Sequence, residues 1–149
     1  MRFVVQRVSS AKVEVARNII GQIDRGFLVL IGISQEDNQA IADRLVKKLL
    51  SLRIFEDNEG KTNLPLADVK GSLLIVSQFT LYADCRKGNK PSFSKAAPPA
   101  VAEGLYNYIV SECRKVVPDI ATGSFGADMK ISLVNDGPFT VILDSSELV

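Results

Sequence analysis

Two uninterrupted apolar runs do most to constrain what this chain of 149 residues can fold into. Residues 27–33 and 73–76 contain no charged side chain, and Gly26 and Gly71 stand shortly before them. Short apolar runs bounded by glycine are typical of strands buried at the centre of a sheet. A third run, residues 141–143, has the same character. The sequence therefore predicts a core built on a β-sheet.

Two longer stretches have the helical period instead. Within residues 39–52, apolar side chains fall on one face and charged side chains on the other, which indicates an amphipathic helix with Asp37 or Asn38 as its cap. The apolar face of this helix consists of Ile41, Leu45, Leu49 and Leu52. Because proline is tolerated in a first helical turn, a second helix is expected from Pro98 to about Val116. Its inner stripe is expected to consist of Val101, Leu105, Tyr108 and Ile109.

The rest of the chain consists of strand patterns separated by turn residues. Further strands are expected at residues 3–8, 12–15, 19–23, 128–134 and 139–143. Residues 57–60 have the composition of a turn, and residues 64–70 that of an irregular segment. This arrangement predicts the α+β class, with a single domain over residues 1–149 that has a mainly antiparallel sheet and two helices packed against it.

Composition argues against several classes of protein. Apolar residues make up 46% and charged residues 23%, as in ordinary globular domains, and a net charge of +1 gives no overall field that would attract a polyanion. Two cysteines without any histidine leave no spacing for a metal site, so neither a metal nor another cofactor is expected. No apolar run is long enough to cross a bilayer, and the two cysteines fit a reducing compartment, so we expect a cytoplasmic protein.

Two short polar segments lie beside the predicted buried strands. Ser77-Gln78-Phe79-Thr80 follows one strand, and residues 135–140 precede another. Polar groups at strand ends are well placed to meet a ligand. Serine and threonine nucleophiles need a nearby base, however, and the sequence contains no histidine. From the residues alone, Ser77 and Thr80 are therefore expected to bond to neighbouring backbone groups.

These two segments belong to a longer series of sequence blocks. The blocks are residues 4–8, 26–32, 52–57, 60–63, 77–84, 87–93, 122–129 and 135–140. In this order, the series resembles the D-aminoacyl-tRNA deacylases over essentially the full 149 residues. The resemblance implies hydrolysis of the ester that joins a D-amino acid or glycine to tRNA, including glycine mischarged on alanine tRNA. It also implies a homodimer with a barrel-like sheet and sites at the subunit interface.

The resemblance further implies roles for the first polar segment. Ser77, Gln78, Phe79 and Thr80 would form the catalytic side of the site. Because nothing in the sequence activates Thr80, we interpret it as a residue that shapes the pocket. Backbone N–H groups near Phe79 and Thr80 would polarise the ester carbonyl as an oxyanion hole. The free 2′-OH of the terminal ribose would then handle the proton in place of a side chain.

For the second segment, the residues and the resemblance predict different backbones. A Gly-Pro step by itself is typical of a hairpin turn with a trans bond, since few X-Pro bonds are cis. The resemblance implies a cis Gly137-Pro138 bond whose carbonyl groups enter the neighbouring subunit's pocket and exclude L-aminoacyl groups. Asn135 and Phe125 would complete this side of the substrate site. Glycyl-tRNA would be accepted, because glycine has no side chain to exclude.

Charged and aromatic residues suggest contacts with RNA. Four cations gather in one loop, namely Arg86, Lys87, Lys90 and Lys95. They could contact phosphate groups of tRNA or form an ordinary solvated surface. Three aromatic rings could stack on the terminal adenine or belong to the core, namely Phe79, Phe93 and Phe125. Two alternatives to an enzyme stay open on the residues alone: a non-catalytic module that binds the 3′ end of aminoacyl-tRNA, and a structural protein with a vestigial pocket.

Overall fold

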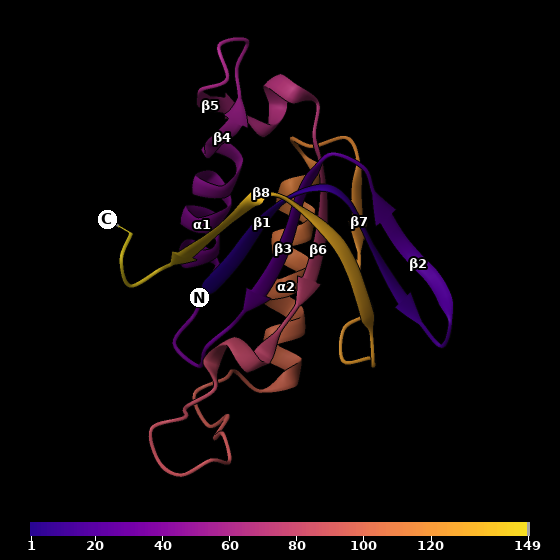
Figure 1. Cartoon of the computed structure of the whole chain (residues 1–149). Coiled ribbons are helices and arrows are strands. Elements are labelled where there is room, and N and C mark those ends of the chain that lie inside the picture. The colour runs from indigo at the N-terminus through magenta and orange to yellow at the C-terminus, as the bar shows by residue number, and fades with distance from the viewer. Residues whose placement is uncertain (149) are drawn as a thin grey trace.

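The fold is organised by one long strand, β1 (Arg2–Val15), which pairs with three others in the computed structural model of the chain. β3 (Gly26–Gly32) runs antiparallel to the first half of β1, and β2 (Asn18–Ile23) runs antiparallel to its second half. β8 (Lys130–Asp144) is antiparallel to β1 over nearly its whole length. Figure 1 shows β1 and β8 crossing the centre of the molecule together.

Two further strands continue the sheet with parallel pairing. β6 (Ser72–Ser77) lies parallel to β3, and β7 (Ile120–Thr122) lies parallel to β6. At the far side, β2 approaches β7 so closely that a Cβ atom at Gly21 would lie 3.0 Å from the carbonyl oxygen of Thr122. The sheet is therefore nearly closed and barrel-like (Figure 1), which confirms the predicted α+β fold. Within residues 1–148, parallel pairing is confined to β3, β6 and β7.

Two helices pack against the sheet, as predicted. α1 (Gln39–Ser51) is capped by Asn38, whose Oδ1 accepts a hydrogen bond from the N–H of Ile41 at 3.0 Å. α2 (Pro99–Arg114) begins at the proline pair, but the expected inner stripe was partly wrong, because Val101 is 50% exposed. The face turned to the sheet is centred one residue later. The buried side chains of α2 are those of Ala102, Leu105, Tyr106, Ile109, Val110 and Cys113.

The two closing strands expected from the sequence form the single strand β8. In the ladder with β1, Gln6 pairs with Thr140 and Val8 pairs with Asn135. Residues 136–139 therefore bulge out opposite one residue of β1, and pairing resumes on both sides of them. A bulge of this kind interrupts a strand without ending it. For this reason the Gly-Pro step, which was expected to separate two strands, lies within one strand.

A hairpin occupies part of the region that was expected to be irregular. β4 (Arg53–Glu56) pairs antiparallel with β5 (Thr62–Pro65), and the 3-10 turn η1 (Leu66–Val69) follows. Between the strands, the carboxylate of Asp57 accepts hydrogen bonds from backbone N–H groups two and four residues further on. These hydrogen bonds fix the turn and bring β4 and β5 together. The residues of β5 have little strand propensity of their own, so the sequence did not predict this strand.

One large apolar cluster fills the space between the helices and the sheet. Among its fully buried members, Phe27 of β3 stacks on Phe55 of β4, with ring centroids 5.1 Å apart.

The structure describes residues 1–148, and Val149, the last residue of the expected domain, lies outside this range. Within the described range, none of the helices has the length and apolar composition that a membrane crossing requires.

Gly26→Ala is expected to destabilise the protein strongly. A Cβ atom at Gly26 would lie 1.9 Å from the carbonyl oxygen of Ser72, so the backbone of β3 or β6 would have to shift. We expect the free energy of unfolding to fall by ~3 kcal/mol in chemical denaturation. Gly104→Ala is the matched control, because a Cβ atom there meets nothing within 4 Å, and α2 should gain up to ~1 kcal/mol. Equal stability of the two variants would contradict the close approach of the strands.

Candidate active site

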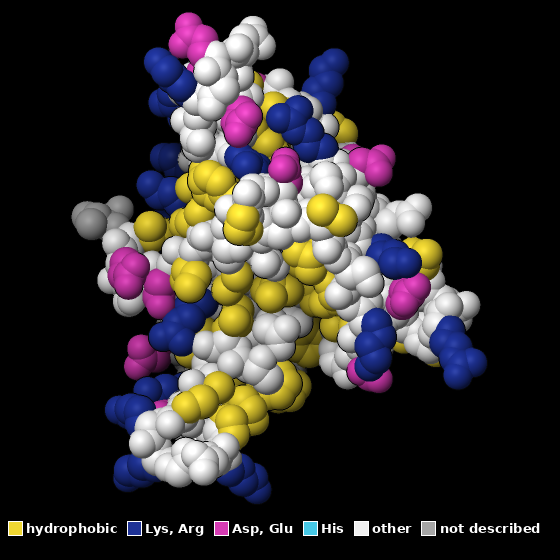
Figure 2. All heavy atoms as spheres, viewed as in Figure 1, with side chains coloured by type: hydrophobic (Ala, Val, Ile, Leu, Met, Phe, Trp, Pro, Cys, Tyr) yellow, Lys and Arg dark blue, Asp and Glu magenta, His cyan; other side chains and the backbone are white. Residues whose placement is uncertain are grey.

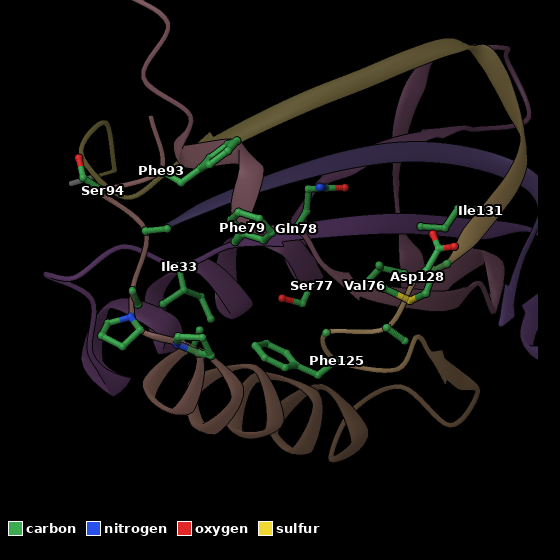
Figure 3. A pocket seen from close by; sticks show the side chains of 18 residues that line it. Ile33, Val76, Ser77, Gln78, Phe79, Phe93, Ser94, Phe125, Asp128 and Ile131 are labelled. Atoms are coloured by element: carbon green, nitrogen blue, oxygen red, sulfur yellow. The ribbon is translucent and has the colours of Figure 1, made fainter. Parts of the chain in front are cut away.

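A cavity of about 760 Å³ opens at the end of β6 (Figure 3). Its apolar walls come from the sheet, from α2 and from the segment before β8, and include Ile33, Val76, Ala102, Phe125 and Met129. Its polar side chains are few and include Ser77, Gln78, Ser94 and Asp128. A concave apolar site with a few polar groups is typical of a pocket that binds a small molecule or the end of a larger one.

Strand β6 carries the first polar segment to this cavity. Ser77 ends the strand, and the N–H of Gln78 donates a hydrogen bond to the carbonyl of Ile31 at 2.7 Å. The chain then turns into a short 3-10 helix, η2 (Phe79–Tyr82), in which the N–H of Leu81 donates to the carbonyl of Gln78 at 3.2 Å. The end of a buried strand therefore fixes where η2 begins.

Thr80 lies beside the cavity and is not one of the residues that line it within the described chain. Its side chain is exposed, and its Oγ1 accepts a hydrogen bond from Nε2 of Gln78 at 2.5 Å. An amide N–H that donates to Oγ1 cannot take the hydroxyl proton, so this contact orients the hydroxyl without activating it. The N–H groups of Phe79 and Thr80 belong to the first turn of η2, where backbone donors have no acceptor within the helix.

Aromatic rings stand at the mouth and in the wall of the cavity. Phe79 and Phe93 are 53% and 40% exposed and meet edge to face with ring centroids 5.1 Å apart, so neither is a core residue. Phe125 meets Tyr106 of α2 edge to face at 6.1 Å. The hydroxyl of Tyr106 donates to the carbonyl of Ile75 at 2.6 Å, and burial raises the pKa of Tyr106 to about 12. Figure 3 shows Phe79 and Phe125 on facing sides of the cavity.

The second polar segment forms the bulge of β8 and stays outside the cavity of its own chain. The Gly137-Pro138 peptide bond is cis, and both residues are exposed. Asn135 closes the bulge, because its Oδ1 accepts from the N–H of Phe139 at 2.6 Å and its Nδ2 donates to Oγ1 of Thr140 at 3.0 Å. In the part of the chain that the structure describes, Phe125 thus lines the same cavity as Ser77, Gln78 and Phe79, whereas the residues of the bulge do not line it.

Arg7 anchors the bulge, although the sequence patterns did not single it out. Its side chain is buried, its Nε donates to the carbonyl of Asp136 at 2.9 Å, and its Nη1 donates to the carbonyl of Ile54 at 2.6 Å. The guanidinium also lies over the ring of Phe139, 4.7 Å from the centroid. The alternation of β1 puts position 7 on the buried face, and this is the sequence signal that marks it.

Lys and Arg side chains lie on the surface of this loop (Figure 2), and the four cations differ in their contacts. Nε and Nη2 of Arg86 donate to the two carboxylate oxygens of Asp84 at 2.9 and 2.7 Å, and these hydrogen bonds hold the pKa of Asp84 well below its usual range. Nζ of Lys95 lies 3.9 Å from the same carboxylate. Lys87 and Lys90 are exposed. Asp84 therefore orients two of the cations and leaves the other two open to solvent.

The cysteines lie in different environments. Cys113 is buried in α2, and burial raises the pKa of its thiol to about 12. Cys85 is exposed in the loop next to Arg86. Among residues 1–148, no group of three or more histidine, cysteine, aspartate or glutamate side chains is arranged to hold a metal ion.

Arg7→Met is expected to lower the free energy of unfolding by ~3 kcal/mol, because the buried carbonyl group of Ile54 and the partly buried one of Asp136 would lose a charged donor. Amide hydrogen exchange at residues 136–139 should become faster. Lys12→Met on the same strand is the control, since its ammonium only approaches Glu14 at 3.6 Å on the surface, and the change should be below ~0.5 kcal/mol. Equal losses in chemical denaturation would show that Arg7 is no anchor.

Known proteins match this chain over nearly its full length. Residues 4–144 match the family model described as D-Tyr-tRNA(Tyr) deacylase. The D-aminoacyl-tRNA deacylase of Thermosipho africanus is 52% identical over 148 residues, which cover 99% of each chain. The D-aminoacyl-tRNA deacylase of Stutzerimonas stutzeri is 54% identical over 145 residues, which cover 97% of this chain and 100% of the relative.

Solved structures share the architecture. The c-Myc DNA Unwinding Element Binding Protein is 45% identical, with a TM-score of 0.92 over 97% of this chain and 98% of that one. A structure described as a probable eukaryotic D-amino acid tRNA deacylase is 20% identical, with a TM-score of 0.76 over 95% and 97% of the two chains, and shares the fold. The chain belongs to the D-Tyr-tRNA(Tyr) deacylase family and is a hydrolase of D-aminoacyl-tRNA.

Proposed function

We propose that the cavity at the end of β6 is where this chain hydrolyses the ester of D-aminoacyl-tRNA, and also that of glycyl-tRNA. The observation that carries the proposal is the meeting of Ser77, Gln78 and the first N–H groups of η2 beside an apolar cavity. The products are tRNA and the free amino acid, which removes wrongly charged tRNA before translation uses it. This substrate gives the activity a cytoplasmic location.

The proposed chemistry uses position and backbone dipoles in place of a catalytic base. Water attacks the ester carbonyl carbon, and the N–H groups of Phe79 and Thr80 stabilise the charge on the carbonyl oxygen, at ~3 kcal/mol per donor. The bond to the 3′ oxygen of the ribose then breaks. The neighbouring 2′-OH accepts the proton of the attacking water and passes a proton to the departing oxygen. The absence of histidine and the hydrogen bond from Gln78 to Thr80 support this role for the substrate's own hydroxyl.

We further propose that main-chain groups from a second copy of the chain reject L-aminoacyl groups. The Gly137-Pro138 bulge is exposed, is held by Arg7 and Asn135, and lies outside its own cavity. Figure 2 shows apolar side chains on the face where β8 lies, and Val134 and Ile142 of this strand are 55% and 63% exposed. A homodimer through this face would bring the bulge of one subunit to the cavity of the other. Carbonyl groups there would exclude an L side chain and admit the hydrogen of glycine.

The loop beside the cavity supplies the proposed contacts with RNA. These contacts are Arg86, Lys87, Lys90 and Lys95. The loop reaches the cavity through Phe93 and Ser94, so phosphate groups near a 3′ end bound in the cavity would pass the cations. The exposed pair of rings at the mouth, Phe79 and Phe93, would stack on the terminal adenine.

A turnover assay with matched D-, L- and glycyl-tRNA tests the proposal. With protein far below the substrate concentration, we expect free amino acid from D-aminoacyl-tRNA and glycyl-tRNA and none from L-aminoacyl-tRNA. Gln78→Ala should reduce turnover about 100-fold, because its side chain lines the cavity and its amide can itself donate to the charge that develops on the ester oxygen. Gln22→Ala, on the exposed side of β2, is the matched control and should leave turnover unchanged. Full turnover by Gln78→Ala would place the active site elsewhere.

The role of the substrate hydroxyl predicts different outcomes for two single changes. Thr80→Ala should keep turnover within ~10-fold of the wild type, whereas tRNA ending in 2′-deoxyadenosine should be hydrolysed at least ~100-fold more slowly. Rates of amino acid release measure both effects, and equal binding of the two tRNAs controls for recognition. Loss of all turnover in Thr80→Ala, together with full activity on the deoxy substrate, would instead indicate a threonine nucleophile.

Shared sites in a homodimer predict that two defective variants restore each other. Gln78→Ala damages the cavity, and Gly137→Val damages the bulge, because position 137 has a φ of 143° that valine rarely adopts. Each mixed dimer would have one site free of both defects, so refolding an equal mixture should return about a quarter of wild-type activity. Sedimentation reports the dimer. A mixture that stays inactive would show that each site uses one chain alone.

A further inference from the structure

We propose that Arg2 is a positioning residue for the active site, acting as a clamp on η2. Nη1 of Arg2 donates to the carbonyl of Leu81 at 2.8 Å, and its Nε donates to Oδ2 of Asp144 at 2.8 Å. Its guanidinium also lies over the ring of Tyr82, with Cζ 4.6 Å from the centroid. Leu81 and Tyr82 end the same short helix whose first residue, Phe79, lines the cavity.

The register of the sheet fixes the place of this clamp. Arg2 pairs with Gly32 of β3 and with Asp144 of β8, so the three residues form one row across neighbouring strands. A Cβ atom at Gly32 would lie 2.8 Å from Cβ of Leu81, so the missing side chain lets η2 pack directly on the sheet. Asp144 is itself held by the N–H and the hydroxyl of Ser146, at 3.0 and 2.8 Å. η2 is thus confined between the surface of the sheet and the guanidinium.

The group that Arg2 binds is one that a helix end leaves without a partner. The last carbonyl groups of a helix have no intrahelical donor, and basic side chains commonly supply one. In η2, the carbonyl of Thr80 accepts from the N–H of Ala83 at 3.0 Å, and the carbonyl of Leu81 accepts from Arg2. A guanidinium can bind Leu81 and Asp144 at once because its donors form a rigid fork, whereas a lysine ammonium is a single point of charge.

This inference rests on the proposed use of the N–H groups of Phe79 and Thr80. Because η2 is a single turn, a tilt of its second half moves the N–H groups at its start. A displacement of about 1 Å at a reacting group can reduce a rate about 100-fold. Arg2 itself does not line the cavity, so its loss should lower kcat and leave KM for the charged tRNA nearly unchanged.

The experiment compares three variants at a temperature where circular dichroism shows each one folded. Arg2→Ala should lower kcat on D-aminoacyl-tRNA by ~10–100-fold with KM within about twofold. Arg2→Lys should recover part of the rate, and millimolar guanidinium should raise kcat for Arg2→Ala alone. Arg44→Ala is the matched control. Arg44 is exposed, lines the same surface depression as Arg2 and donates a hydrogen bond to the carbonyl of Leu148. The kcat of this variant should equal that of the wild type.

Amide hydrogen exchange of residues 79–83 without substrate separates the clamp from the chemistry. Faster exchange in Arg2→Ala, and not in Arg44→Ala, is expected. Unchanged exchange in both variants would overturn the clamp, as would a rise in KM with kcat unchanged. Faster exchange in Arg2→Ala with an unchanged kcat would show that Arg2 clamps η2 but that η2 takes no part in catalysis. This result would overturn both the positioning role of Arg2 and the proposed use of the N–H groups of η2.

Discussion

The parallel pairing of β3 with β6 is the contact on which the site depends. β6 is buried up to its last residue, Ser77, so the burial of its apolar side chains sets its register against β3. A slip of one residue would turn every side chain of the strand to the opposite face. The ladder continues one step beyond the strand through the N–H of Gln78 and the carbonyl of Ile31. The packing of the hydrophobic core therefore determines the residue at which η2 begins.

Arginine side chains hold backbone carbonyl groups at three places where regular strand pairing stops. Arg2 binds the carbonyl at the end of η2, Arg7 binds that of Asp136 in the bulge of β8, and Arg53 binds that of Asn63 at 2.8 Å in the β4–β5 hairpin. A guanidinium stays charged and offers several donors in one plane, so it can satisfy carbonyl groups from two elements together. The chain has no histidine, and in the mechanism proposed above these contacts hold in place the main-chain groups that take over the work of catalytic side chains.

Local patterns predicted local structure well. The buried strands at residues 27–33 and 73–76, both helices and the cap at Asn38 follow from short-range periodicity and capping chemistry, and the structure has them. The ordered series of blocks predicted the family. Parallel pairing and the near closure of the sheet depend on contacts between residues distant in sequence, which periodicity does not encode. The sequence did not predict a structural role for Arg7, because a charged residue is not expected at a buried position of a strand, even where the alternation of the strand points it inward.

The surroundings of the two thiols make the native chain a single-cysteine protein for practical purposes. A maleimide reacts with thiolate, which the buried sulfur of Cys113 scarcely forms at neutral pH with a pKa of about 12. The exposed Cys85 lies beside Arg86, in the loop that reaches the cavity mouth. A fluorophore or spin label therefore attaches at one defined point near the place where an RNA end would arrive. Binding can be followed there in the unmodified sequence.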